Sequence, residues 1–159
     1  DPGCLKACPS PGAIVKWLFK SGSEHAYTLI GEDDVPRPAY GAYWLYARYM
    51  GDRFVETTTS ALTEVNAHAA LRTDGALTAI FVNKTTSTKR VRVALDGFCV
   101  GRTRQLTLTG EGYAATAFAI EGQALDPAAA RDGIVQADAP APFEVTLPPT
   151  SARLVVYEP

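Results

Sequence analysis

The sequence predicts a mainly β protein, an antiparallel β-sandwich of about eight short strands with an N-terminal strand–helix segment packed on it. Two observations predict the sandwich: segments that alternate apolar and polar residues follow one another from residue 53 onwards, and turn residues separate most of them. A third, a dense aromatic stretch at 36–55, predicts the helix. We expect residues 1–52 to hold an arm, a short strand and the helix, and residues 53–159 to form the sandwich.

The N-terminal part gives weaker signals. Residues 1–12 contain three prolines and predict an irregular arm, whereas the apolar run at 13–20 is too short to distinguish helix from strand. Residues 25–30 (HAYTLI) predict a strand, and the loop GEDDVPRP follows it. The acidic residues of that loop precede the helix, where they would oppose the positive end of its dipole.

The aromatic stretch predicts a helix that begins near Pro38 and stops at Gly51. Apolar residues occupy most of its circumference. One face carries Tyr40, Tyr43, Trp44, Ala47 and Met50, and another carries Tyr46 and Tyr49. Such a helix needs cover on more than one side, which indicates a junction between two layers or two domains.

Alternation at period two predicts the strands. They are expected at 53–57, 64–72, 76–83, 89–95, 104–110, 133–138, 142–148 and 152–157. Asp74-Gly75 is a strong hairpin signal between the second and the third. The gap at 111–132 predicts an irregular excursion with a brief strand.

Composition narrows the function classes. The net charge of −2 argues against non-specific binding to nucleic acid, which needs a basic surface. No apolar run approaches the ~20 residues of a membrane span, so we expect no membrane partner. The chain starts at Asp1, so either a signal peptide has been removed or the chain is a fragment.

Cysteine and histidine give no metal-site pattern. Cys4 and Cys8 could close a small disulfide loop; the alternative is three unpaired thiols, with Cys99 acting as a small buried hydrophobe. His25 and His68 are isolated, so we expect no metal. Phosphate-loop and dinucleotide fingerprints are missing, so we expect no cofactor.

Few side chains could carry chemistry. Glu24 and His25 could act as an acid–base pair. We favour the interpretation that their side chains do not meet, because neighbours on a strand point to opposite faces. The acidic residues 32–34 could bind a cation, although a solvated loop is the simpler interpretation. Residues 83–85 (Asn-Lys-Thr) match the N-glycosylation acceptor pattern, which is common by chance.

The helix aromatics could form a platform for stacking sugars, but helical spacing of aromatics more often reflects core packing. His68, between two alanines, is expected on the outward face of its strand or at an edge. Neither feature defines a site by itself.

Three motifs, in order, carry a family resemblance: RPAYGAYWLYARYMGDR at 37–53, Val-Asn-Lys at 82–84 and PFEVTLPPTS at 142–151. Over residues 13–159 the chain resembles the C-terminal part of retaining glycoside hydrolases. Those enzymes, such as arabinofuranosidases, xylosidases and glucuronidase-like enzymes, join a (β/α)8 barrel to a β-sandwich. The resemblance implies a last barrel strand and helix followed by the sandwich domain.

The resemblance also implies what this sequence lacks. Retaining glycosidases need two carboxylates about 5–5.5 Å apart, which such barrels present at the ends of earlier strands. Those strands are absent from this sequence, so no catalytic residue is carried over. The candidate carbohydrate-contacting residues are His25 and Tyr27, by analogy with positions near the last barrel strand, and Tyr46 and Tyr49 on the helix.

We therefore expect a non-catalytic accessory β-sandwich related to glycoside hydrolases. The alternatives are a carbohydrate-binding module that uses exposed aromatics and a part of a glycosidase completed by a separate barrel chain. The expected partners are carbohydrate or a glycosidase barrel, with a monomer or weak self-association through the aromatic helix. We expect a secreted or periplasmic location.

Overall fold

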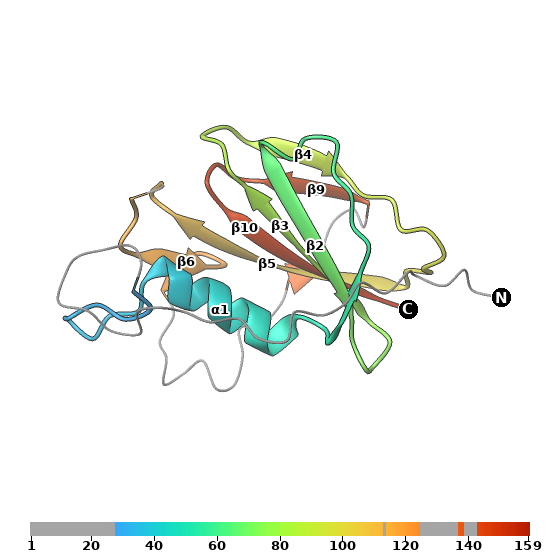
Figure 1. Ribbon diagram of the computed structural model, residues 1–159, viewed down its shortest axis with the longest axis horizontal. Helices are drawn as coiled ribbons and strands as arrows, with labels where there is room; N and C mark the ends of the chain where they lie inside the picture. Colours follow the sequence, from blue (N-terminus) through green and yellow to red (C-terminus); the bar gives the residue numbers. More distant parts are fainter. Residues whose placement is uncertain (1–27, 113, 125–136, 139–142) are drawn as a thin grey trace.

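The computed structural model describes residues 28–112, 114–124, 137–138 and 143–159 (Figure 1). The described part holds helix α1 (Pro38–Tyr49) and ten strands. The strands are β1 (Arg53–Val55), β2 (Val65–Leu71), β3 (Leu77–Asn83), β4 (Lys89–Arg92), β5 (Arg102–Gly110), β6 (Phe118–Ile120), β7 (Gln123–Ala124), β8 (Ala137–Asp138), β9 (Glu144–Leu147) and β10 (Ala152–Glu158). This confirms the predicted mainly β class.

The strands form two antiparallel sheets. The large sheet has the order β1-β2-β3-β10-β5-β6-β7, and β8 also pairs with β5. The second sheet contains β4 and β9 alone. The C-terminal strand β10 lies in the middle of the large sheet, where Leu154 is opposite both Ile80 of β3 and Leu106 of β5.

Each face of the large sheet buries a separate apolar core. On one face the sheet packs against β4 and β9, and on the other it packs against α1, as Figure 1 shows. Successive residues of β10 belong alternately to the two cores, because side chains along a strand point to alternate faces of the sheet. Val155 and Tyr157 join the core beneath β4 and β9, and Leu154 and Val156 join the core beneath α1.

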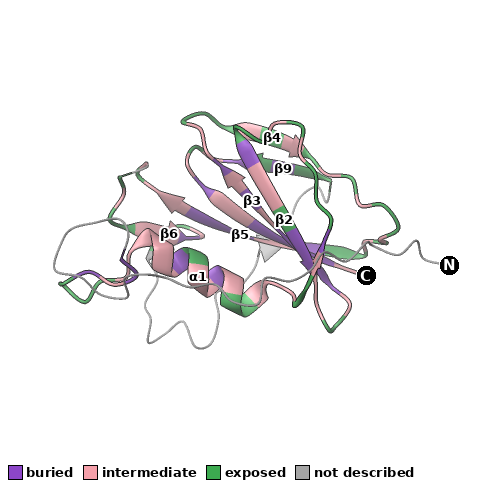
Figure 2. Ribbon diagram, viewed as in Figure 1, coloured by how far each residue is buried: buried purple, intermediate pink, exposed green. Residues whose placement is uncertain are grey.

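Helix α1 lies close to the sheet through Gly41 and Leu45, its two buried residues (Figure 2). A Cβ atom at Gly41 would lie 2.4 Å from the ring of Phe118, so only glycine allows this approach. The helix ends at Tyr49, and the following Gly51 passes close to β2, where a Cβ would lie 2.3 Å from the Leu71 carbonyl oxygen.

The hairpin between β2 and β3 forms as predicted. Gly75 adopts a positive φ of 87°, which favours glycine. The Asp74 carboxylate accepts a hydrogen bond from the Ala76 N–H at 3.1 Å, and the Arg72 N–H donates to the Ala76 carbonyl at 2.8 Å. The turn therefore sets the register in which Leu71 pairs with Leu77.

Several local features differ from expectation. In the described end of the predicted strand at 25–30, Ile30 forms a single bridge with Pro36. In the described part of the predicted excursion at 111–132, where one brief strand was expected, there are two short strands, β6 and β7. Cys99 is exposed and not buried, whereas Cys4 and Cys8 lie outside the described residues.

A local ion pair holds the acidic loop before α1. None of its acidic residues lies in the first turn of the helix. Asp33 accepts a hydrogen bond from the Val35 N–H and forms an ion pair with Arg37, both at 3.1 Å. This pairing closes the loop locally because Arg37 directly precedes α1.

No helix in the described part of the chain has the length and apolar character that a membrane span needs.

Candidate functional site

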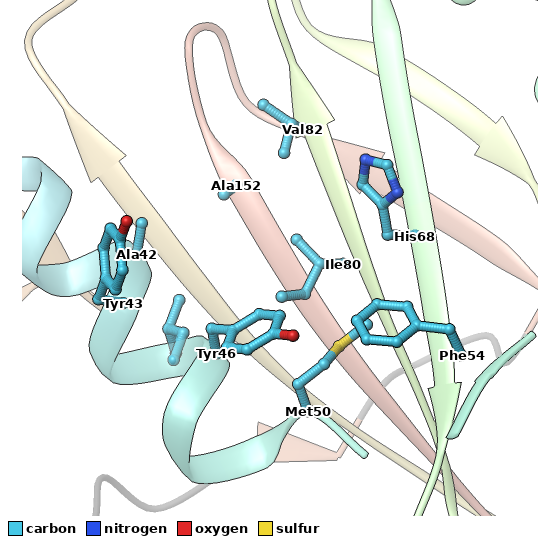
Figure 3. A pocket seen from close by; sticks show the side chains of 10 residues that line it. Ala42, Tyr43, Tyr46, Met50, Phe54, His68, Ile80, Val82 and Ala152 are labelled. Atoms are coloured by element: carbon cyan, nitrogen blue, oxygen red, sulfur yellow. The ribbon is translucent and has the colours of Figure 1, made fainter. Parts of the chain in front are cut away.

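An apolar groove with a volume of about 430 Å³ lies beside α1 (Figure 3). It runs between the helix and the strip of the large sheet formed by β2 and β3. Its lining residues are Ala42, Tyr43, Leu45, Tyr46, Met50, Phe54, His68, Ile80, Val82 and Ala152. We refer to it as the α1 groove.

One wall of the groove is a side of α1. Tyr43, Tyr46 and Met50 stand three and four residues apart, so helical geometry places them one above the other. Figure 3 shows Tyr46, Met50 and Phe54 meeting at one end of the groove. Tyr46 and Phe54 are stacked, with ring centroids 6.3 Å apart and planes inclined by 25°.

The other wall is the face of the sheet. Ile80 and Val82 alternate with the buried residues Ala79 and Phe81 of β3, which point into the core on the opposite face. His68 is exposed on β2 and lies directly opposite Ile80 in the strand register. The groove is thus the part of the α1-side face that α1 itself leaves open.

The aromatic residues of α1 lie on different faces from those that the sequence predicts. Tyr40, Trp44 and Tyr49 pack on the core beneath α1, and Ala47 is exposed. Trp44 and Tyr49 meet edge to face at 5.7 Å, and the Arg48 guanidinium lies 5.8 Å from the Trp44 ring centre. The expected pairing of Tyr46 with Tyr49 on one face is therefore wrong.

Of the candidate carbohydrate-contacting residues, Tyr46 lines the groove and Tyr49 packs on the core. His25 and Tyr27 lie outside the described residues. The sequence analysis did not predict the wall of the groove that the sheet forms. The Asp74-Gly75 hairpin signal could have predicted it, because a hairpin centred on Asp74 pairs His68, six residues before it, with Ile80, six residues after it.

The groove is almost entirely apolar. Its polar groups are the imidazole of His68 and the hydroxyls of Tyr43 and Tyr46, and no carboxylate lines it. In the described residues, no three His, Cys, Asp or Glu side chains gather where they could hold a metal ion. The groove can therefore bind an apolar surface, but it does not offer the carboxylate pair of a retaining glycosidase.

Asn83 has a structural role that explains the Asn-Lys-Thr sequence. The residue is 2% exposed, and its side-chain amide nitrogen donates to the carbonyls of Ser87 at 2.8 Å and Pro148 at 2.7 Å. Its oxygen accepts from the Thr85 N–H at 3.0 Å. The nitrogen to which a glycan would be attached is thus occupied and enclosed.

Two titratable groups on the opposite face of the large sheet are shifted by burial. Burial raises the pKa of Tyr157, which lies in the core beneath β4 and β9. Desolvation lowers the pKa of Arg153, and the nearby charge of Glu121 opposes that shift. Arg153 donates from Nε to the Thr107 hydroxyl at 3.0 Å, so it takes part in a structural network away from the α1 groove.

Comparison with solved structures finds this fold in regions of several glycoside hydrolases. The GH51 α-L-arabinofuranosidase of Thermotoga petrophila matches 83% of this chain with a TM-score of 0.63 and 19% identity. The α-L-arabinofuranosidase of Thermotoga maritima matches 84% with a TM-score of 0.60 and 17% identity. A GH44 xyloglucanase of Paenibacillus polymyxa matches 74% with a TM-score of 0.52 and 21% identity.

The matched part is only a fraction of each enzyme. The chain spans 32% of either arabinofuranosidase and 22% of the xyloglucanase. At these identities the likeness shows the fold, and it confirms the expected resemblance to one region of such enzymes. No protein-family model and no curated protein matches the chain.

Proposed function

We propose that this chain is a non-catalytic accessory β-sandwich of a glycoside hydrolase. The observation that carries the proposal is the partial match: most of this chain corresponds to about a third of an arabinofuranosidase. The chemistry of the α1 groove supports it, because the groove lacks the two carboxylates that retaining hydrolysis requires. On this proposal the protein works where such hydrolases meet polysaccharide, in a secreted or periplasmic location.

A second candidate is a carbohydrate-binding module. The observation in its favour is the set of aromatic rings at the groove, those of Tyr43, Tyr46 and Phe54. Against it stands the near absence of polar lining, since a sugar ring carries hydroxyls that need hydrogen-bond partners when they leave water. We therefore rank it below the accessory role.

Hydrolysis by the purified chain tests the first proposal. We expect no release of nitrophenol from nitrophenyl arabinofuranoside, xyloside or glucuronide, with a complete arabinofuranosidase as the positive control. Turnover that copurifies with the chain and is lost when the chain is removed by an affinity step would contradict a non-catalytic role.

Affinity electrophoresis in gels containing arabinan, xylan or xyloglucan tests the second candidate. We expect the chain to migrate as it does in plain gels. Retardation that disappears in Tyr46→Ala, but persists in the core-side variant Tyr49→Phe, would establish the module and displace the accessory proposal.

A further inference from the structure

We infer that Asp96-Gly97 is a site of spontaneous chemical modification in the folded protein, at which the aspartate converts to isoaspartate through a cyclic succinimide. The reaction uses only this chain and water, so the inference is independent of the proposed function. An Asp-Gly pair favours the reaction, because glycine has no side chain to hinder the approach of its backbone nitrogen. The chain contains three such pairs, at 74–75, 96–97 and 132–133, and the last lies outside the described residues.

The rearrangement neither adds nor removes an atom overall. The Gly97 nitrogen attacks the Cγ atom of the protonated Asp96 carboxyl group, an N–Cγ bond forms, and the carboxyl OH leaves with the amide hydrogen as water. Water then adds to one of the two ring carbonyls. Addition at Cγ restores aspartate. Addition at the backbone carbonyl carbon breaks the original C–N bond and gives isoaspartate, in which the main chain runs through Cβ and Cγ.

The turn at Asp96-Gly97 leaves both reacting groups free. Both residues are exposed, and Gly97 adopts a positive φ of 72°. Within the described part of the chain, no hydrogen bond or ion pair holds the Asp96 carboxylate or the Gly97 N–H. The turn is closed by the Phe98 N–H, which donates to the Leu95 carbonyl at the long distance of 3.5 Å. The peptide between Asp96 and Gly97 can therefore rotate until the nitrogen reaches Cγ.

The turn at Asp74-Gly75 holds the same groups in place. The Asp74 carboxylate accepts a hydrogen bond from the Ala76 N–H at 3.1 Å and another from the Arg72 guanidinium at 2.7 Å. The Gly75 N–H donates to the Arg72 carbonyl at 3.1 Å. The bond from Ala76 lowers the pKa of Asp74, so less of this carboxyl group is in the protonated form that reacts. Asp74-Gly75 is therefore a protected pair within the same chain.

The modification would disturb the connection between the two sheets. Residues 93–101 join β4 to β5, and four of their side chains, those of Val93, Leu95, Phe98 and Val100, pack on the core beneath β4 and β9. Isoaspartate adds one atom to the main chain between Leu95 and Phe98. Because protein interiors are close-packed, these two side chains would then no longer fit their places together.

Peptide mapping of the aged protein tests the inference, because trypsin places each Asp-Gly pair in a peptide of its own: residues 73–84, 93–102 and 132–153. The purified chain is incubated in mildly acidic buffer, which favours the protonated carboxyl, with and without denaturing urea. Chromatography of the digest separates the isoaspartyl form of each peptide, electron-transfer fragmentation identifies it, and an isoaspartyl methyltransferase labels it independently.

The folded and the unfolded chain should give different ratios. In the folded protein we expect isoaspartate to accumulate at least about tenfold faster in peptide 93–102 than in peptide 73–84, since charge-assisted hydrogen bonds hold Asp74. In urea both turns are lost, so we expect the two rates to agree within about threefold.

Asp96→Glu is the matched control variant. It keeps the negative charge at an exposed position, but its ring would have six members and form far more slowly. We expect the variant to lack the isomeric form of peptide 93–102 and to leave the rate in peptide 73–84 unchanged. Circular dichroism confirms that it is folded.

Four outcomes would overturn the inference. They are the absence of isoaspartate from peptide 93–102 of the folded protein, equal rates in peptides 93–102 and 73–84 before unfolding, an isomeric form of peptide 93–102 that persists in Asp96→Glu, and a difference of the same size in urea. The last would attribute the difference to the neighbouring residues in the sequence and not to the two turns.

Discussion

Asn83 connects three parts of the chain: the end of β3, the loop before β4 and the end of β9. Its amide group holds the carbonyls of Ser87 and Pro148, and its carbonyl holds the Thr85 N–H. A side chain of this kind appears in the sequence only as part of a common tripeptide. Its role depends on burial, which the pattern of neighbouring residues does not reveal.

We expect Asn83→Ala to lower the free energy of unfolding by about 3 kcal/mol, because buried carbonyls lose their donors. Asn83→Asp should cost at least as much at neutral pH, since a carboxylate would face those carbonyls. Urea unfolding measures both, with the exposed Thr88→Ala as the control. A loss below about 1 kcal/mol for Asn83→Ala would contradict the bonding described.

The β2–β3 turn stabilises the ionised form of Asp74 through a hydrogen bond and an ion pair. The hydrogen bond from the Ala76 N–H lowers the pKa of Asp74 below its ordinary 3.8, burial opposes this, and the charge of Arg72 lowers the pKa further. Because the folded-state pKa is the lower one, this stabilisation is present above the unfolded-state pKa and is lost as pH falls through the folded-state pKa.

We therefore expect the stability difference between the wild type and Asp74→Asn to be larger at about pH 6 than at about pH 2.5. Chemical unfolding at both values measures it. Asp96→Asn, an exposed carboxyl in another loop, serves as the control for general charge effects. A difference that stays constant between the two pH values would argue against a role of the Asp74 charge.

Among the elements, α1 shows most clearly what the sequence could and could not predict. Its limits were predictable because Pro38 and Gly51 mark them. Its faces were not, because apolar residues occupy both the side that packs on the core and the side that lines the groove. Periodicity distinguishes an apolar side from a polar one, and here the two sides are alike.

The close approach of α1 to β6 depends on Gly41. Gly41→Ala should gain about 0.5–1 kcal/mol from helix propensity and lose about 1–3 kcal/mol from overpacking against Phe118, for a net loss. Denaturant unfolding of Gly41→Ala, Phe118→Leu and the double variant measures the coupling. Net stabilisation by Gly41→Ala alone would show that the ring moves aside freely.

The long strands were predictable from their apolar residues. Alternation identified β2 and β5, and the sequence also predicted β3 and β10, which carry buried residues on both faces of the sheet. Strands β6 and β7 contain three and two residues, too few for a period to show. The groove was not predicted because its lining comes from positions as distant as Ala42 and Ala152, which only the strand order brings together.

For the whole molecule, two cores share one sheet. The β4–β9 sheet is joined to the large sheet through side chains such as those of Val145 and Leu147, which are buried between the two sheets.

Leu147 is 0% exposed, so we expect Leu147→Ala to lower the free energy of unfolding by about 2–5 kcal/mol. Hydrogen exchange should then speed up first at amides of β4 and β9, whereas the exposed Thr146→Ala should change little. Equal acceleration of hydrogen exchange in both sheets would contradict the expectation that the β4–β9 sheet opens separately from the large sheet.

The central place of β10 has a consequence for how the chain folds. This strand, the last in the sequence, joins β3 to β5, so the two halves of the large sheet cannot combine until its residues have left the ribosome. Until then β3 and β5 each present an unpaired edge. Such long-range pairing is typical of slow folding. A nascent chain halted before Ala152 would expose the unpaired edges of β3 and β5 and would be prone to aggregate.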